Sequence, residues 1–134
     1  MPSRAVLISA EPQLFVADIA ASCDFFVRKL GFAVVFTTGE PPFYGHVARD
    51  GARLNLRCVR APVLDPARCE RDSLLSASLT VARTSEIDAL YDEFQAAGAA
   101  FAQDLQGQPW GARNFIVRDL DGNLLLFAGP AERT

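Results

Sequence analysis

Apolar and polar residues follow two different periods along this chain, and the periods predict strands and helices in a fixed order. Residues 13–17 alternate at the period of two that is typical of a half-buried strand. Asp18 then predicts a helix start, because its carboxylate can accept a hydrogen bond from a free N–H of the first turn. The helix should end at Gly31. Its apolar positions form one stripe: Ile19, Cys23, Phe26, Val27 and Leu30.

Three strands are predicted after this helix. Residues 32–37 are rich in aromatic and β-branched side chains, and the run 39–42 with its two prolines breaks the strand. Residues 43–49 and 52–59 follow as a hairpin, because Asp50 and Gly51 form a favoured two-residue turn.

The second half repeats this order. A strand over residues 74–82 precedes a helix that Thr84 or Ser85 should cap and Gly98 should end. A weaker strand is predicted over 100–106, and the final hairpin joins 114–117 to 124–127 through a turn at Asp121 and Gly122. The buried stripe of this helix is expected to be Ile87, Leu90, Tyr91, Phe94 and Ala97.

The repeat predicts an α+β fold of tandem βαβββ modules that form a curved mixed sheet around a concave cleft. We expect one domain over residues 1–134, with modules at 10–60 and 74–130 and a connector at 60–73 that can hold a short helical turn. Each module has one helix to cover one face of its strands, so the other face should be covered by the other module or line a cavity.

Composition excludes several classes of function. The formal net charge is −3, with no basic stripe to neutralise phosphates, which argues against nucleic-acid binding and leaves small molecules or proteins as partners. Apolar runs are too short for a membrane span. Three cysteines without metal-finger spacing indicate reduced thiols and a cytoplasmic protein. Cys23 should be packed, whereas Cys69, in the connector, is expected to be exposed.

Strand alternation assigns the side chains that face the cleft. Leu54 and Leu56 should lie under the helix, and Leu14 and Val16 likewise. The residues between them and the small hydroxyls of the strand over 74–82 then face the cleft; the candidate ligand-binding residues among these are Phe15, Asn55, Arg57, Ser76 and Ser78.

Aromatic side chains supply further candidates. Trp110, the only tryptophan, lies in a loop between Pro109 and Gly111, where it reaches the rim of the sheet. Arg113 could hold an anionic group. His46 lies mid-strand beside Tyr44 and is more typical of a structural residue than of a general base. The aromatic residues within or beside the cleft strands are Phe15, Phe36, Phe43, Tyr44, Phe101, Trp110 and Phe115, of which Phe15, Phe43, Tyr44 and Trp110 are ligand candidates.

The end of the chain resembles the closing hairpin of the vicinal oxygen chelate superfamily, the glyoxalase and bleomycin-resistance proteins. The residues that carry the resemblance are Asp119, Leu120, Asp121 and Gly122, with Leu for the usual Pro, and the lead-in Trp110, Gly111, Ala112 and Arg113. The resemblance covers about residues 10 to 129 and implies a ligand cleft and a homodimer.

Metal-dependent members of that superfamily hold a divalent ion with four His or carboxylate ligands, one pair from each half. The matching positions here are Glu11, Asn55, Ser76 and Leu126, of which only Glu11 is a natural ligand. The resemblance therefore implies the metal-free, bleomycin-resistance-like branch, with no cofactor and no catalytic residues.

Three hypotheses follow. The first is a dimeric small-molecule binding protein that sequesters an aromatic or natural-product ligand without a metal. The second is a metal-dependent glyoxalase-like lyase or dioxygenase with non-standard ligands, using Glu11 and His46. The third is a fold that serves only as an interaction module.

Overall fold

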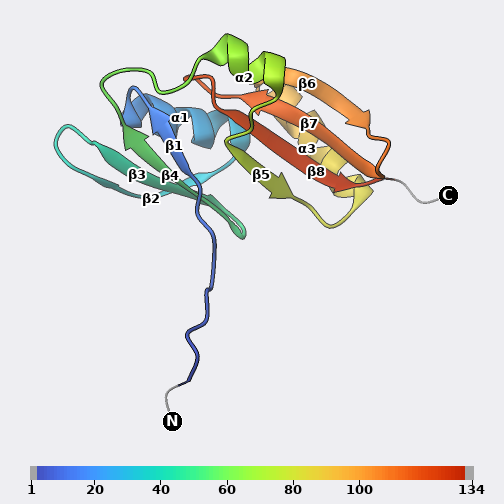
Figure 1. Ribbon diagram of the computed structural model, residues 1–134, viewed down its shortest axis with the longest axis horizontal. Helices are drawn as coiled ribbons and strands as arrows, with labels where there is room; N and C mark the ends of the chain where they lie inside the picture. The colour runs from blue at the N-terminus through green and yellow to red at the C-terminus, as the bar shows by residue number, and fades with distance from the viewer. Residues whose placement is uncertain (1–2, 132–134) are drawn as a thin grey trace.

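The computed structural model describes residues 3–131. It contains two four-stranded sheets and three helices, which lie as two halves side by side (Figure 1). In chain order the elements are β1 (Gln13–Val16), α1 (Ile19–Leu30), β2 (Ala33–Thr38), β3 (Tyr44–Arg49), β4 (Ala52–Cys58), α2 (Pro66–Asp72), β5 (Ala77–Thr80), α3 (Thr84–Ala96), β6 (Ala100–Gly107), β7 (Ala112–Arg118) and β8 (Leu124–Pro130).

Both sheets have the same topology. The strand order is β1-β4-β3-β2 in the first and β5-β8-β7-β6 in the second. In each, the first strand of the module runs parallel to the last, and the remaining pairs are antiparallel. This arrangement confirms the predicted α+β fold of tandem βαβββ modules. β5 is shorter than the predicted strand over 74–82, and β6 is a full strand interrupted by bulges.

The first helix starts and ends as predicted. The Asp18 carboxylate accepts a hydrogen bond from the Ala21 N–H at 3.0 Å, and Gly31 takes up the left-handed conformation at φ 71°. The second helix, α3, does not start as predicted, because neither Thr84 nor Ser85 is its N-cap. Arg83 is the N-cap of α3 without a side-chain hydrogen bond, because the Thr84 hydroxyl instead donates to the Pro130 carbonyl at 2.7 Å.

A core built from both modules lies between the helices and the sheets. Phe94 and Phe115 are fully buried in it and meet edge to face. Phe101 also packs here, so neither it nor Phe115 is available to the cleft. The predicted buried stripe of α1 was wrong at one position. Val27 is exposed, whereas Phe25, which was not predicted, is buried against Phe26.

The connector contains a two-turn helix, α2, where only a short helical turn was predicted. It covers one end of the second sheet on the face opposite α3 (Figure 1). Asp65 caps α2, and Cys69 packs against Ile116 and Leu124. Cys69 is therefore buried, and its predicted exposure was wrong; only one residue of this short helix is buried, so the sequence carries no helical period. None of the described helices has the length and apolar character needed to cross a membrane.

Candidate functional site

The face of the first sheet that points away from α1 gathers most of the predicted cleft residues. Leu54 and Leu56 are buried in the core, as alternation predicted, so the residues between them point outward. Strand register then sets side chains in two rows across the sheet. One row runs Gln13, Asn55, His46, Phe36; the next runs Phe15, Arg57, Tyr44, Thr38.

His46 is the most enclosed member of these rows, with only 5% of its surface exposed. Its Nδ1 lies 2.5 Å from Asn55 Oδ1 and 3.6 Å from Glu11 Oε1. In the tautomer with hydrogen on Nδ1, this contact is a hydrogen bond to the Asn55 amide oxygen, and Nε2 can then accept a hydrogen bond. The ring of Phe36 stacks on the imidazole, with centroids 5.6 Å apart and planes 1° apart.

Exposed aromatic surface borders this buried group. Phe36 is 46% exposed, and the half-buried Tyr44 tilts against it with ring centroids 6.1 Å apart. Phe43 is also exposed, but its backbone continues the pairing of β3 with β4, so its side chain alternates with that of Tyr44 and lies on the other side of the sheet. Large apolar side chains exposed together beside fixed polar groups are typical of a binding surface. We call Phe36, Tyr44, His46, Asn55 and Arg57 the aromatic face.

Sequence reasoning did not include His46 among the ligand candidates, although a signal was present. A two-residue turn at Asp50 and Gly51 fixes the register of the hairpin, which places residue 46 opposite 55 and 44 opposite 57. His46 therefore had to share a face and a row with Asn55.

The second module holds the remaining candidates apart from this face. The Ser76 hydroxyl donates to Asn123 at 3.0 Å. Trp110 is 73% exposed in the turn between β6 and β7. Arg113 lies on the helix side of its sheet, where its Nε donates to Asp88 of α3 at 2.7 Å. Asn55, Arg57 and Tyr44 thus lie together on the first sheet, with Phe15 at the end of their second row. The predicted residues of the second module do not lie together.

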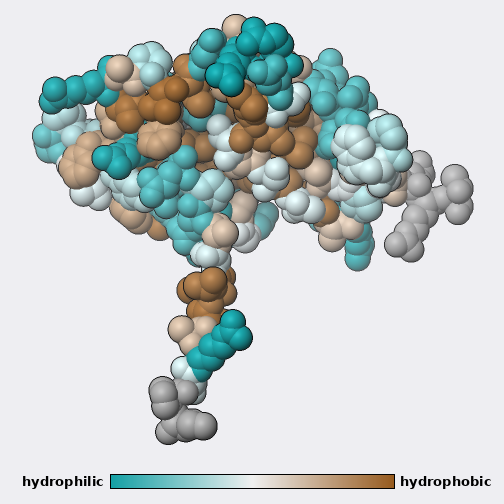
Figure 2. Space-filling model, viewed as in Figure 1, coloured by the Kyte–Doolittle hydropathy of each residue, from teal (hydrophilic) through white to brown (hydrophobic). Residues whose placement is uncertain are grey.

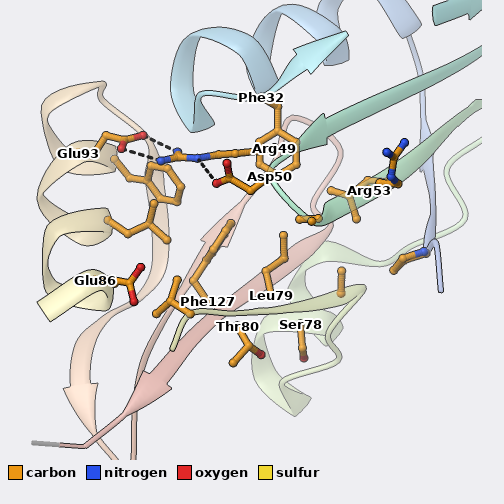
Figure 3. Close-up of a pocket in the computed structure, with 18 of the residues that line it drawn as sticks. Phe32, Arg49, Asp50, Arg53, Ser78, Leu79, Thr80, Glu86, Glu93 and Phe127 are labelled. Atoms are coloured by element: carbon orange, nitrogen blue, oxygen red, sulfur yellow. Dashed lines mark hydrogen bonds and ion pairs between the residues drawn. The ribbon is translucent and has the colours of Figure 1, made fainter. Parts of the chain in front are cut away.

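A cavity of about 620 Å³ opens between the modules, under α3 and beside β5 (Figure 3). Phe32, Leu79 and Phe127 line its apolar part, and Ser78 lies on its β5 side. On its rim Arg49 from β3 donates two hydrogen bonds to Glu93 of α3, at 2.6 and 3.0 Å. We call this cavity the intermodule groove.

The family model described as Glyoxalase/Bleomycin resistance protein/Dioxygenase superfamily matches residues 8–127. The chain belongs to this superfamily. The resemblance of the closing hairpin is thereby confirmed. A comparison with curated proteins finds no match.

Solved structures of the superfamily share the fold over nearly the whole chain. TioX from Micromonospora sp. ML1 is 25% identical, with a TM-score of 0.64, covering 91% of this chain and 99% of its own. The bleomycin-binding protein from Streptomyces verticillus, in complex with copper(II)-bleomycin, is 24% identical, with a TM-score of 0.67 and coverage of 97% and 100%. The fosfomycin resistance protein FosX from Listeria monocytogenes is 11% identical, with a TM-score of 0.68 and coverage of 95% and 96%.

The donor set of this superfamily member does not fit the four-ligand metal site of its metal-dependent relatives. Glu11 and Asn55 lie together with His46, but the other two matching positions supply nothing comparable. The Ser76 hydroxyl is bonded to Asn123, and Leu126 packs in the apolar cluster under α2. Within residues 3–131 no three His, Cys, Asp or Glu side chains gather in one place.

Proposed function

We propose that this protein binds an aromatic or natural-product small molecule on the aromatic face and holds it without a metal ion. The observation that carries the proposal is the buried His46, fixed by Asn55 and stacked under Phe36, next to aromatic rings that remain exposed. A planar ligand can continue this stack, since offset aromatic contacts add to the gain from burying apolar area.

The polar groups of the face give the ligand an orientation. The Nε2 of His46 can accept a hydrogen bond, and Arg57, whose side chain is exposed, can donate several to a carbonyl or an acidic group. Because Asn55 and Phe36 hold the imidazole in place, its acceptor is fixed before the ligand arrives, which reduces the ordering cost of binding.

Relatives support this class of function. One of the solved structures is a bleomycin-binding protein in complex with copper(II)-bleomycin, and another is a fosfomycin resistance protein. By analogy we propose antibiotic sequestration as the biological role. We also propose a homodimer, since a second copy can turn the open aromatic face into a cleft, and a cytoplasmic location, on the basis of the three free thiols.

Two of the remaining predicted residues enter the proposal. Phe15 borders the aromatic face within one chain. Trp110 belongs to the second module and is exposed, and we propose that the partner copy brings it toward the ligand. Ser76 and Arg113 are held by Asn123 and Asp88, and Ser78 lies in the intermodule groove, so these three have no part in the proposed ligand contact. Trp110 then serves as a natural reporter, because its exposed indole responds to a nearby aromatic molecule.

Titration of the protein with a panel of aromatic natural products that includes bleomycin, followed by Trp110 fluorescence and by calorimetry, tests the proposal. At least one compound should bind saturably. Phe36→Ala should weaken it about tenfold, the effect of losing one stacked ring. Val27→Ala, which removes an exposed apolar side chain on α1, is the matched control and should leave affinity unchanged. A flat response to every compound contradicts the proposal and favours an interaction module.

A metal-dependent lyase or dioxygenase is the second candidate function. The observation in its favour is the approach of Glu11 to His46, two side chains of ligand type. Elemental analysis of the purified protein separates the two candidates: a stoichiometric transition metal that is lost in Glu11→Gln and His46→Ala supports the enzyme and overturns metal-free binding.

A further inference from the structure

Arginines without a carboxylate partner gather at one strand of the first module. Arg49 and Arg118 each pair with a glutamate, whereas Arg53, Arg57 and Arg60 pair with no carboxylate within residues 3–131. These three belong to β4 or follow it directly, and all three are exposed. The formal net charge of the chain is −3, so β4 departs from the average of the molecule. Such a group of positive charges attracts anions to its own surface, whatever the net charge.

Two of these arginines share a face of β4 with Asn55. Strand alternation puts Arg53, Asn55 and Arg57 on the side of the aromatic face, because Leu54 and Leu56 between them are buried in the core. Figure 2 shows hydrophilic and apolar surface side by side over this module, on the left of the view. A group that binds at Asn55 therefore lies between two positive charges.

Little negative charge opposes these arginines on the aromatic face. Neither of the two rows of side chains across the sheet contains an Asp or a Glu. Glu11 is a carboxylate that approaches the face, and it already has contacts of its own. One of its oxygens accepts from Ser9 Oγ at 2.8 Å, and the other lies 3.6 Å from His46 Nδ1. The donors of Arg57 are therefore available to an anionic ligand.

The register of the sheet sets the distance between the aromatic rings and the positive charge. Tyr44 and Arg57 are directly opposite each other on paired strands, where Cβ atoms are about 5 Å apart. A ring that packs on Tyr44 therefore has its edge beside the guanidinium group. Phe36 lies on β2, two strands away from Arg57, which is about 10 Å at the ordinary spacing of strands. A fused two-ring system with an acidic group at one end matches this distance.

The donors on β4 suit an acid better than a neutral or a cationic group. A guanidinium group can donate two parallel hydrogen bonds to one carboxylate, and both are strengthened by charge. The Asn55 amide nitrogen keeps two N–H donors, because the amide oxygen is the atom that meets the imidazole of His46. A neutral ligand leaves the positive charge of Arg57 without a partner, and an amine is repelled by it.

We propose that the ligand of the aromatic face is an aromatic acid. Its rings pack on Phe36 and Tyr44, its carboxylate is bound by Arg57, and Arg53 adds a second positive charge beside Asn55. This inference rests on the function proposed above and narrows the class of ligand. Arg57 then determines specificity for charge, whereas Phe36 contributes affinity that does not depend on the charge of the ligand, so the two contributions can be measured separately.

Calorimetric titration of the full chain with three naphthalene derivatives tests the preference. The carboxylate should bind about tenfold more tightly than the carboxamide, which has nearly the same shape without the charge, and the aminomethyl compound should bind most weakly. The preference should shrink as salt rises from about 0.05 M to about 0.5 M. Equal affinities for carboxylate and carboxamide, or tightest binding of the amine, contradict the acid preference alone and leave the aromatic face as a ligand site. No binding by any of the three contradicts both proposals.

Substitutions of Arg57 locate the carboxylate. Arg57→Gln should bring the affinities for carboxylate and carboxamide within about twofold of each other, and Arg57→Lys should keep a preference of about threefold, because lysine has the charge without the planar pair of donors. Phe36→Ala should weaken both compounds equally.

Arg83→Gln is the matched control. It removes an exposed arginine next to the start of α3 that has no ion pair within residues 3–131, and it should leave the preference unchanged. Circular dichroism compares the folding of each variant with that of wild type. A folded Arg57→Gln that keeps the tenfold preference contradicts the role of Arg57, and so does an equal loss of preference in Arg83→Gln.

Discussion

Asn123 is the buried polar residue that ties the two modules together, and its replacement by Ala tests how they are held. Only 2% of it is exposed. Its amide donates to the Asp119 carboxylate at 2.9 Å and to the Phe15 carbonyl at 3.2 Å, and its oxygen accepts from Ser76 at 3.0 Å. The change to Ala removes all three contacts without adding bulk.

The expected cost follows from those contacts. Each neutral hydrogen bond contributes about 0.5–1.5 kcal/mol net, and one to a charged group about 1.5–3 kcal/mol. Asn123→Ala should therefore lower the free energy of unfolding by about 3 kcal/mol at neutral pH. For a chain of this size that corresponds to roughly 10 °C in Tm.

The loss should also depend on pH, because one partner ionises. Burial raises the pKa of the Asp119 carboxyl above its ordinary value, although hydrogen bonds from Asn123 and Asp121 act to lower that pKa. Removal of the Asn123 amide raises the pKa further, so the folded state holds the charged carboxylate less well. This part of the loss in unfolding free energy is present at high pH, where Asp119 is charged, and it disappears as pH falls and Asp119 gains its proton.

Urea unfolding at about pH 7 and about pH 4 measures this difference. Asn114→Ala is the matched control: Asn114 is also buried, but it accepts hydrogen bonds from the neutral amides of Gln103 and Gln108 within one module. Its cost should be the same at both pH values. If Asn123→Ala costs under about 1 kcal/mol, or the same at both pH values, the account of this contact is wrong.

Other substitutions test the remaining contacts. Arg49→Met should cost about 1–2 kcal/mol, because it breaks a two-pronged, half-exposed ion pair between modules, whereas Arg28→Met, at an exposed pair on α1, should cost under about 0.5 kcal/mol; thermal unfolding of both variants compares them. Gly122→Ala should lower Tm by several degrees in the same assay, roughly 1–2 kcal/mol, because Gly122 has φ 85° and a Cβ there would lie 2.8 Å from Cγ of Pro66. A hydrogen bond from Arg118 lowers the pKa of Glu70. The stabilisation of the folded state by this pair is therefore complete above the pKa of Glu70 in the unfolded chain, and it is lost as pH falls through the lowered pKa of the folded state. Glu70→Gln should reduce Tm at neutral pH and leave Tm unchanged in strong acid.

The fold could be predicted from sequence because its signals are local and occur twice. Asp18 and Gly31 fix the ends of α1 through their own caps, and the two-residue turn at Asp50 fixes the register of a hairpin. Alternation placed Asn55 and Arg57 on the correct side of β4. Each of these inferences depends on neighbours close in the chain, whose geometry is set by backbone chemistry.

The site could be predicted only in part, because its remaining features depend on residues far apart in sequence. Thr84 is not a cap since the end of β8 takes its hydroxyl, and Cys69 is buried because α2 folds back over the second sheet. Arg113 pairs with Asp88 on α3, a contact that alternation alone does not show.

The most direct test of the central claim is a two-dimensional NMR titration of labelled protein with the tightest-binding compound of the aromatic panel. Ligand binding on the aromatic face predicts that the largest shifts occur at the imidazole nitrogens of His46 and at the amides of Tyr44, Asn55 and Arg57, with little change on the outer surface of α1. Shifts confined to Ser78, Leu79 and the other residues of the intermodule groove, with His46 unmoved, would contradict it.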